Sequence, residues 1–191
     1  MFLRLGRAGY FSHPPEVAAF LRLIGILNAA VWLGAIVFFT LLVGPAFFSN
    51  EMQQLLGKPH AGAAAQIILE RYFILQQWCA GIALSHLIAD RLYTGKSLHK
   101  LTLFLLMGLF AIGVVGGNLL YPKMKQLHLI KYAVQTTPEQ KSAAARSFSI
   151  LHGLSQAVNL LVLGSVLYYS WQTVNSGRPT LRRPLAGTGF V

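Results

Sequence analysis

The chain has 191 residues, of which 54% are hydrophobic, and its 16 Lys and Arg against 5 Asp and Glu give a formal net charge of +11. The hydrophobic content excludes an intrinsically disordered chain, and the single cysteine excludes a disulfide-stabilised scaffold. The net charge would fit a soluble nucleic-acid-binding domain only if the basic residues gathered on one folded surface, so their positions decide the class of protein.

Four long segments contain no charged residue, namely residues 23–43, 72–89, 101–121 and 147–173. Each can cross bilayer hydrocarbon as a helix, since about 30 Å takes about 20 residues at about 1.5 Å per residue. Because every charge lies outside these segments, we exclude a soluble basic domain and expect no nucleic-acid partner. The sequence predicts an all-α fold: an integral membrane four-helix bundle, in contact with lipid, that forms one transmembrane domain over residues 1–191.

The first helix is expected at about residues 15–44. Two prolines ahead of Glu16 fit a first helical turn, where a missing N–H costs nothing and an acid meets the positive end of the helix dipole. Pro45 is expected to end the helix, because a proline ring clashes with the preceding turn. The apolar run is longer than the core of a signal peptide, and no small-x-small cleavage pattern follows it before Pro45, so we expect the helix to be retained.

The second helix is expected at about residues 63–92, after a short connection. Glu70 and Arg71 near its start can anchor it at the membrane interface, which we favour, or guide protons or bind an anion. Further along, polar and small residues at helical spacing predict the face that turns into the bundle. They are Gln76, Cys79, Ala83, His86 and Asp90.

The third and fourth helices are expected at about residues 99–121 and 138–173. Residues 137–140 supply Thr as N-cap, Pro at the first helical position and Gln three residues after the cap, which is a capping-box pattern. Residues 123–134 have apolar side chains at helical spacing, so they either extend the third helix to pack on the fourth or lie flat in the interface. We expect both helices to extend beyond the membrane on its outer side.

The distribution of basic residues predicts the orientation. The larger share of the 16 Lys and Arg lies on the side that holds both termini and the connection between the second and third helices. By the positive-inside rule this side is cytoplasmic. We therefore expect a protein of the bacterial inner membrane with both termini in the cytoplasm, and a basic C-terminal tail at residues 174–191.

A polar stripe on the fourth helix is the main candidate site. His152, Ser155, Gln156 and Asn159 recur at i, i+3, i+4 and i+7, so they share one face, and polar groups in hydrocarbon need partners. Asn118 lies near the outer end of the third helix. We favour a His152 that is hydrogen-bonded inside the bundle. The alternative is a ligand of haem, chlorophyll or copper, with Asn159, Gln156 and Asn118 around it.

A second, weaker metal-site hypothesis groups His86, Asp90 and His99 near the inner ends of two helices. His86 and His152 cannot hold one haem between them, because they lie near opposite ends of their spans. The chain also lacks the sequence motifs of covalent haem attachment, zinc proteases and nucleotide hydrolysis. We therefore expect a protein that is not an enzyme and whose sequence requires no cofactor.

Three pairs of small residues four positions apart would let helix backbones approach closely. They are Ala30 with Gly34, Gly113 with Gly117, and Gly153 with Ala157. Together these pairs predict a compact bundle.

Several short motifs stand out along the chain. They are Trp32-Leu33-Gly34, Phe38-Phe39, Gly44-Pro45-Ala46, Arg71-Tyr72-Phe73, Tyr121-Pro122-Lys123-Met124, and Phe148 before His152-Gly153-Leu154-Ser155 and Asn159-Leu160. Spread over about residues 20–172, they resemble the family of transmembrane protein 205 and its bacterial relatives, the domain of unknown function 4149. The resemblance implies a four-helix membrane protein without an established reaction, whose animal member is associated with resistance to platinum drugs.

The first helix is also distantly similar to membrane bundles of the copper-resistance D type. That resemblance implies clusters of Met or His at the outer face, whereas here Met124 and His152 stand almost alone. The departure argues against copper transport.

Three functions follow from these observations. We favour a non-catalytic accessory or scaffold subunit of a larger membrane complex, with glycine-rich faces that dock on other membrane proteins. The first alternative is a metal- or tetrapyrrole-binding bundle that uses His152. The weaker alternative is a small-solute or proton transporter that uses Glu70, Arg71 and the stripe on the fourth helix, although four helices leave little room for a pore.

Overall fold

The computed structural model describes residues 15–95 and 99–175. Within these ranges the chain forms helices and no strand. Four helical rods are long and apolar enough to cross a membrane: Glu16–Phe47, Asn50–Tyr93, Lys100–Tyr132 and Pro138–Asn175. This confirms the all-α four-helix bundle. Most of the expected basic tail, from residue 176 onward, lies outside the described residues.

The first rod consists of three helical segments. α1 (Pro15–Phe38) runs through a five-residue π-helical segment, η1 (Phe39–Val43), into the short α2 (Gly44–Phe47). The expected stop at Pro45 is therefore wrong, because the helix continues to the end of α2. The backbone N–H that follows η1 donates to a carbonyl five residues back, and this wider turn leaves room for the proline ring.

The third rod has the same construction. α4 (Lys100–Val115) runs through η2 (Gly116–Leu120) into α5 (Tyr121–Tyr132), so Pro122 also follows a π-helical turn. The helix extends past its expected end at residue 121, and α5 packs against α6 (Pro138–Asn175). Of the two expectations for residues 123–134, the extended third helix is confirmed.

The second rod, α3 (Asn50–Thr94), begins well before its expected start at residue 63. The Ser49 hydroxyl caps it by accepting a hydrogen bond from the Met52 N–H at 3.2 Å. The rod is broken at Gly57, whose φ of 73° is a conformation that favours glycine. The short connection that the sequence predicts is thus itself helical, with a sharp change of direction inside it.

The capping box ahead of α6 is confirmed. The Thr137 N–H donates to the Gln140 side-chain oxygen at 3.1 Å, and the Gln140 N–H donates to the Thr137 hydroxyl at 3.3 Å. Two backbone donors at the start of this long helix are satisfied in this way.

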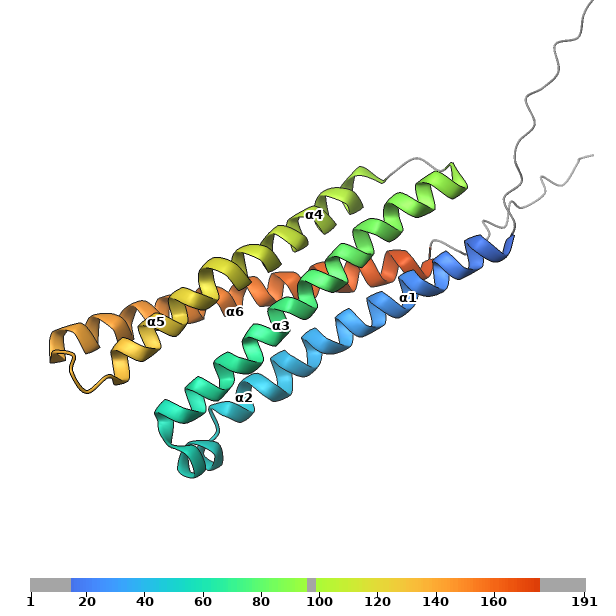
Figure 1. Ribbon diagram of the computed structural model, residues 1–191. Helices are drawn as coiled ribbons and strands as arrows, with labels where there is room; N and C mark the ends of the chain where they lie inside the picture. The colour runs from blue at the N-terminus through green and yellow to red at the C-terminus, as the bar shows by residue number, and fades with distance from the viewer. Residues whose placement is uncertain (1–14, 96–98, 176–191) are drawn as a thin grey trace, which may run out of the picture.

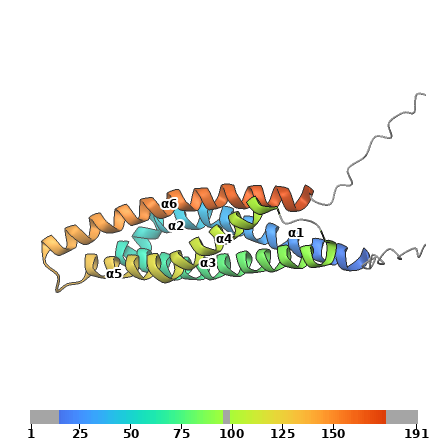
Figure 2. The same cartoon turned by 90° about the horizontal axis from the view of Figure 1, so that it is seen from above.

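The four rods form an elongated bundle with two different ends. We call the end that holds the start of α1 and the end of α6 the near end, and the opposite end, with α2 and the α5–α6 connection, the far end (Figure 1). At the far end α5 and α6 pack together and diverge from α2 and the start of α3. Seen from above, α3 and α5 lie in one layer and α6 in the other (Figure 2).

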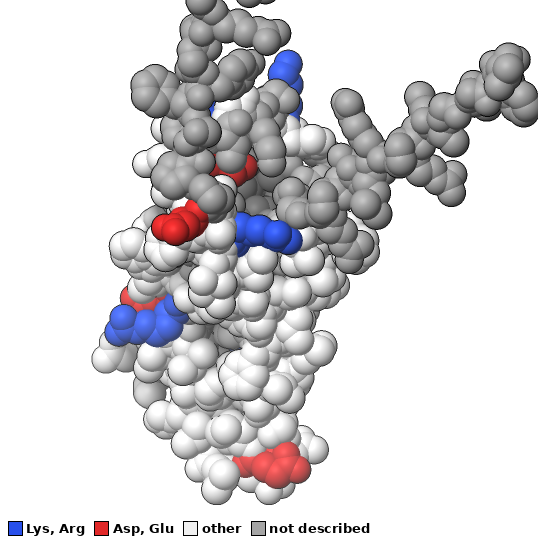
Figure 3. All heavy atoms as spheres, turned by 90° about the vertical axis from the view of Figure 1, so that its right-hand side faces the viewer, with Lys and Arg blue, Asp and Glu red and all other residues white. Residues whose placement is uncertain are grey.

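The closed core lies in the middle of the bundle. Its fully buried large side chains are Trp32, Ile36, Leu106 and Val166. Ala80 and Ala83 on α3 are 0% exposed, so the rods approach closely there. Most other large apolar side chains face outward, and charged side chains form small separate groups on the described surface seen from the near end (Figure 3). Such a surface fits contact with lipid, and the chain is an integral membrane protein.

Candidate functional site

A cavity of about 1130 Å³ occupies the far half of the bundle. Its walls come from η1 and α2, the first half of α3, the α4–α5 rod and the first half of α6. The lining is mostly apolar and aromatic, and no Asp or Glu of the described residues contributes to it. Ligand sites in proteins are typically concave, apolar and furnished with a few polar groups, and this cavity has that character.

A chain of hydrogen bonds forms the floor of the cavity, towards the middle of the bundle. The Trp32 indole N–H donates to the Gln76 side-chain oxygen, and the Gln76 amide donates to the Tyr72 hydroxyl at 2.6 Å. That hydroxyl donates to the Asn159 side-chain oxygen at 2.8 Å, and the Asn159 amide donates to the Thr40 hydroxyl at 2.7 Å. The floor thus ties the first rod, α3 and α6 together with fully paired polar groups.

The floor also explains why α3 turns its polar stripe inward. Gln76, Cys79 and Ala83 are all buried, as their spacing predicts. Cys79 is a packing residue whose backbone carbonyl accepts a hydrogen bond from the Asn28 amide at 3.0 Å. The side chain of Tyr72 is fixed further by Phe39, whose ring stacks on it at 4.1 Å between centroids.

His152 lies on another wall of the cavity, among aromatic rings. Its imidazole is parallel to the Phe148 ring, with 6.0 Å between centroids, and tilted against the Phe48 ring at 5.6 Å. Within residues 15–95 and 99–175, no group hydrogen-bonds to the imidazole nitrogens. The Ser155 hydroxyl donates to the His152 backbone carbonyl at 2.7 Å, not to the ring. Ring packing rather than a hydrogen bond therefore holds His152.

The three residues expected around His152 have different positions. Gln156 is exposed but lines the cavity, whereas Asn159 belongs to its floor. Asn118 is exposed on η2, where its amide donates to the Val114 carbonyl one turn back at 3.0 Å, and it does not line the cavity. Asn118 thus lies outside the cavity, with its amide bound to its own helix.

His128 on α5 is a cavity residue that sequence reasoning missed. It is buried, and its Nε2–H donates to the Pro59 carbonyl at 3.0 Å, since a carbonyl can only accept. Its ring lies 6.1 Å from that of Phe148. A Cβ atom at Gly62 would lie 2.5 Å from the His128 ring, so any larger residue there would force the ring to shift. The spacing from Met124 to His128, i to i+4, was the signal for a shared buried face.

A family model for the domain of unknown function DUF4149 matches residues 27–133. The chain belongs to this family. The match covers most of the first rod, α3, α4 and α5, and leaves α6 with His152 and Asn159 outside it. No curated protein and no solved structure matches the chain. Membership of the DUF4149 family therefore agrees with a helical membrane protein and brings no reaction with it.

The second metal-site hypothesis for the DUF4149 chain is not supported by the arrangement. In the described part of the chain, no three His, Cys, Asp or Glu side chains lie close enough together to hold a metal ion. His86 packs against Gly25 of α1, where a Cβ atom would lie 2.7 Å from the imidazole. His99 is exposed, and its Nδ1 lies 3.4 Å from the Thr102 hydroxyl. His86, Asp90 and His99 are thus not brought together.

Glu70 and Arg71 are both exposed on α3, and neither lines the cavity. The Tyr121 hydroxyl donates to the Glu70 carboxylate at 2.9 Å, and the Lys125 ammonium lies 5.9 Å from the Tyr121 ring centroid. Glu70 therefore ties α3 to α5 on the outside of the bundle.

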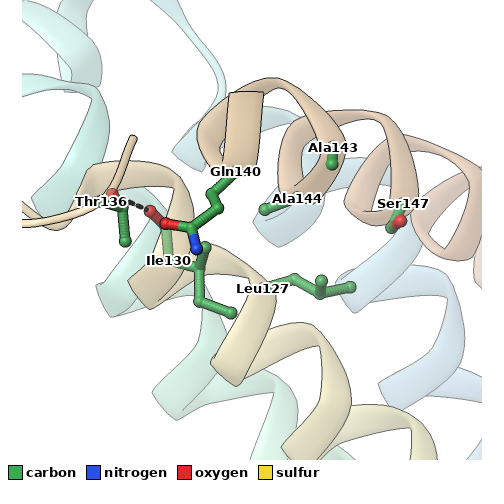
Figure 4. Close-up of a pocket in the computed structure, with 7 residues that line it drawn as sticks. All are labelled: Leu127, Ile130, Thr136, Gln140, Ala143, Ala144 and Ser147. Carbon is green, nitrogen blue, oxygen red and sulfur yellow. Dashed lines mark hydrogen bonds between the residues drawn. The ribbon is translucent and has the colours of Figure 1, made fainter. Parts of the chain in front are cut away.

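A smaller hollow of about 350 Å³ lies between α5 and α6 at the far end (Figure 4). Leu127 and Ile130 of α5 face Ala143 and Ala144 of α6 across it. Its other lining residues are Thr136, Gln140 and Ser147, and the side-chain oxygens of Thr136 and Gln140 bond to nearby backbone groups.

Proposed function

We propose that this DUF4149 protein is a non-catalytic membrane protein that binds a small apolar or amphipathic molecule in its far-half cavity. The observation that carries the proposal is the cavity itself: about 1130 Å³, apolar on most walls and polar at one paired floor. A space of this size without an occupant would deprive its lining atoms of dispersion contacts. Since apolar cavities take up apolar molecules rather than water, an apolar ligand is the natural occupant.

The chemistry of the lining argues for binding rather than catalysis. Its described residues include no carboxylate and no thiol. The Ser155 and Tyr72 hydroxyls are engaged as donors to a backbone carbonyl and to Asn159. No hydroxyl of the described lining residues hydrogen-bonds to a lining histidine, so these residues lack the nucleophile beside an oriented base that acyl- or phosphoryl-transfer sites require.

A photoactivatable hydrocarbon tests the proposal. The full chain in nanodiscs would be labelled with a diazirine-bearing alkane, and the labelled residues mapped by mass spectrometry. Ala65, which lines the cavity, would be changed to Phe, and the exposed Ala63 to Phe as the matched control. We expect cavity labelling to fall about tenfold in A65F, equivalent to about 1.4 kcal/mol, and to stay constant in A63F. Labelling that is spread evenly over lipid-facing residues, and is the same in both variants, would contradict the proposal.

Outward-facing small residues favour a second function, that of an accessory or scaffold subunit. Gly113 and Gly117 pack against α3, as expected, but a Cβ atom at Gly34 or Gly153 would meet nothing within 4 Å. Two of the three expected small-residue pairs therefore lie on outer faces, where small side chains let a helix of another protein approach closely.

Cross-linking in native membranes tests this second function. We expect Gly153→Leu to reduce cross-links to other membrane proteins, whereas Leu161→Phe, on a neighbouring exposed face of α6, leaves them unchanged. An identical cross-link pattern for the wild type and G153L would reject a docking role for this face.

We also propose a bacterial inner-membrane location with both termini in the cytoplasm, on the evidence of the basic residues at the near end. A fluorescent protein that folds only in the cytoplasm, fused to the C-terminus, provides the test. A bright fusion is expected. A fusion that is stably produced but dark would show that the C-terminus lies outside the cytoplasm, which would contradict the proposed orientation.

A further inference from the structure

We infer that the cavity ligand is an anionic amphiphile, whose acidic headgroup lies at the far-end mouth and whose hydrocarbon chain lies in the cavity. This inference rests on the proposed function of the cavity. It starts from the charges of the lining, where Lys58 and Lys131 are the charged residues among those described and no acidic residue accompanies them.

The two lysines come from opposite walls. Lys58 directly follows the break at Gly57, so the sharp change of direction in α3 sets it at the start of the long helical part. Lys131 lies in the last turn of α5 and is half-buried, with its ammonium 5.1 Å from the Tyr132 ring centroid. A cation over an aromatic face is held in position without being neutralised.

The two ammonium groups have no anionic partner among the described residues. Neither forms an ion pair with an acidic side chain in the described part of the chain, and Glu70, the acid nearest along α3 to the cavity, is bound to Tyr121 outside it. Lys58 is exposed and Lys131 is half-buried, and two like charges beside one apolar space repel each other. An anionic headgroup between Lys58 and Lys131 would offset this repulsion. Basic pockets between membrane helices bind lipid headgroups for this reason.

Deeper in the cavity, Gln66 supplies an independent sign of a ligand. Its side chain is 7% exposed, it lines the cavity, and its Nε2 has no hydrogen-bond partner among the described residues. A buried amide donor without an acceptor has lost its hydrogen bonds to water and gained none in return, so such donors are normally paired. Gln66 lies eight residues along α3 from Lys58, about 12 Å at 1.5 Å per residue. A carboxyl, phosphate or ester oxygen below the headgroup can accept this hydrogen bond.

The order of groups along the cavity matches the order of groups in an amphiphile. Ammonium groups stand at the mouth, an unpaired amide donor follows, and apolar side chains such as Leu69 and Phe73 line the part beyond it. Two classes of molecule have this chemistry: an anionic glycerophospholipid and a free fatty acid.

Lipid retention by the full chain tests the inference. The protein would be exchanged into micelles that contain phosphatidylcholine, phosphatidylglycerol or palmitate in equal amounts, and the bound molecules counted by native mass spectrometry. The test variant is the double substitution K58Q/K131Q. The control is K123Q/K125Q, which removes the same charge from exposed residues of α5 outside the cavity. We expect K58Q/K131Q to lower the retention of the anionic species about tenfold, equivalent to about 1.4 kcal/mol, and the control to leave it unchanged.

A third variant, Gln66→Leu, preserves volume and removes the amide donor. We expect it to weaken retention of the anionic species without changing the melting temperature, since its amide nitrogen has no partner in the described protein. Preferential retention of phosphatidylglycerol identifies a phospholipid, and preferential retention of palmitate identifies a fatty acid.

Equal retention of phosphatidylcholine and the anionic species, or equal losses in both double variants, would overturn the inference. The diazirine labelling distinguishes a failure of this inference from a failure of the proposed cavity function. If the diazirine alkane still labels the cavity while K58Q/K131Q leaves the retention of anionic species unchanged, only the assignment of an anionic headgroup is wrong. If the alkane does not label the cavity, the proposed function fails as well.

Discussion

The middle and the far half of this bundle are built from the same four rods but differ in how closely the rods approach. In the middle, alanines such as Ala80 and Ala83 bring α3 against its neighbours and enclose Trp32 without a gap. In the far half, the chain passes through two π-helical segments and the break at Gly57, and a cavity of about 1130 Å³ lies between the rods. The comparison indicates that the closed middle supplies stability and the irregular far half supplies the site.

The largest effect is expected from opening the closed middle. Trp32 is 1% exposed, so Trp32→Ala should lower the free energy of unfolding by about 3–5 kcal/mol through a cavity that its neighbours cannot fill. Thermal unfolding in detergent measures this loss. Trp78 is 68% exposed and serves as the control, for which Trp78→Ala should change little. Equal losses in the two variants would show that the middle is no more tightly packed than the lipid-facing surface.

The next effect concerns the close contact on the cavity wall. Gly62→Ala places a methyl group 2.5 Å from the His128 ring, and the strain should cost about 1–3 kcal/mol. The melting temperature is expected to recover partly when G62A is combined with H128A, since the clash is then removed. Gly81→Ala is the control, because its Cβ atom meets nothing within 4 Å. A G62A protein as stable as G81A would contradict the described contact.

A smaller effect is expected at the floor that separates the two regions. Tyr72→Phe and Asn159→Ala each remove the hydrogen bond between these residues, which is 2.8 Å long. A double-mutant cycle on the free energy of unfolding should give a coupling of about 0.6–1.7 kcal/mol, the range found for interhelical hydrogen bonds in membranes. Independent effects of the two substitutions would mean that the bond does not form in the membrane.

The smallest effect on stability is expected at His152. Its ring packs on Phe148 and Phe48, so His152→Ala should cost about 0.5–1.5 kcal/mol. The visible absorption spectrum and the copper content of the purified protein should not change, because we propose an apolar or amphipathic ligand. A haem or chlorophyll band, or bound copper, that disappears in H152A would instead favour the metal- or tetrapyrrole-binding alternative.

The sequence predicted the rods well where a single physical rule applied. Uncharged segments of sufficient length gave four membrane-spanning helices, and the Thr137–Gln140 capping box began α6 as its pattern indicated. The sequence did not predict the helix ends correctly where the effect of a proline competed with a local change in helix type. A proline ring ends an α-helix, yet at Pro45 and Pro122 a π-helical turn accommodates it, and no simple composition rule predicts such a turn.

The candidate site was predicted in part. The face of α6 with His152 and Asn159 does turn to the cavity, because polar side chains at helical spacing avoid lipid. Asn118, which was grouped with them, lies outside the cavity, where its amide donates to the Val114 carbonyl. His128 was missed because it lies in a segment with three lysines, which reads as exposed in the sequence.

The sequence by itself therefore determined the class of protein, the number of spanning helices and the segments that lie outside them, because the cost of charge in hydrocarbon acts on each residue separately. Only the tertiary structure decided where the rods part. It placed Lys58, Gln66 and Lys131 around one space and directed Asn118 away from it. That outcome depends on how the rods pack against one another, including the break at Gly57, because packing brings together residues that lie far apart along the chain.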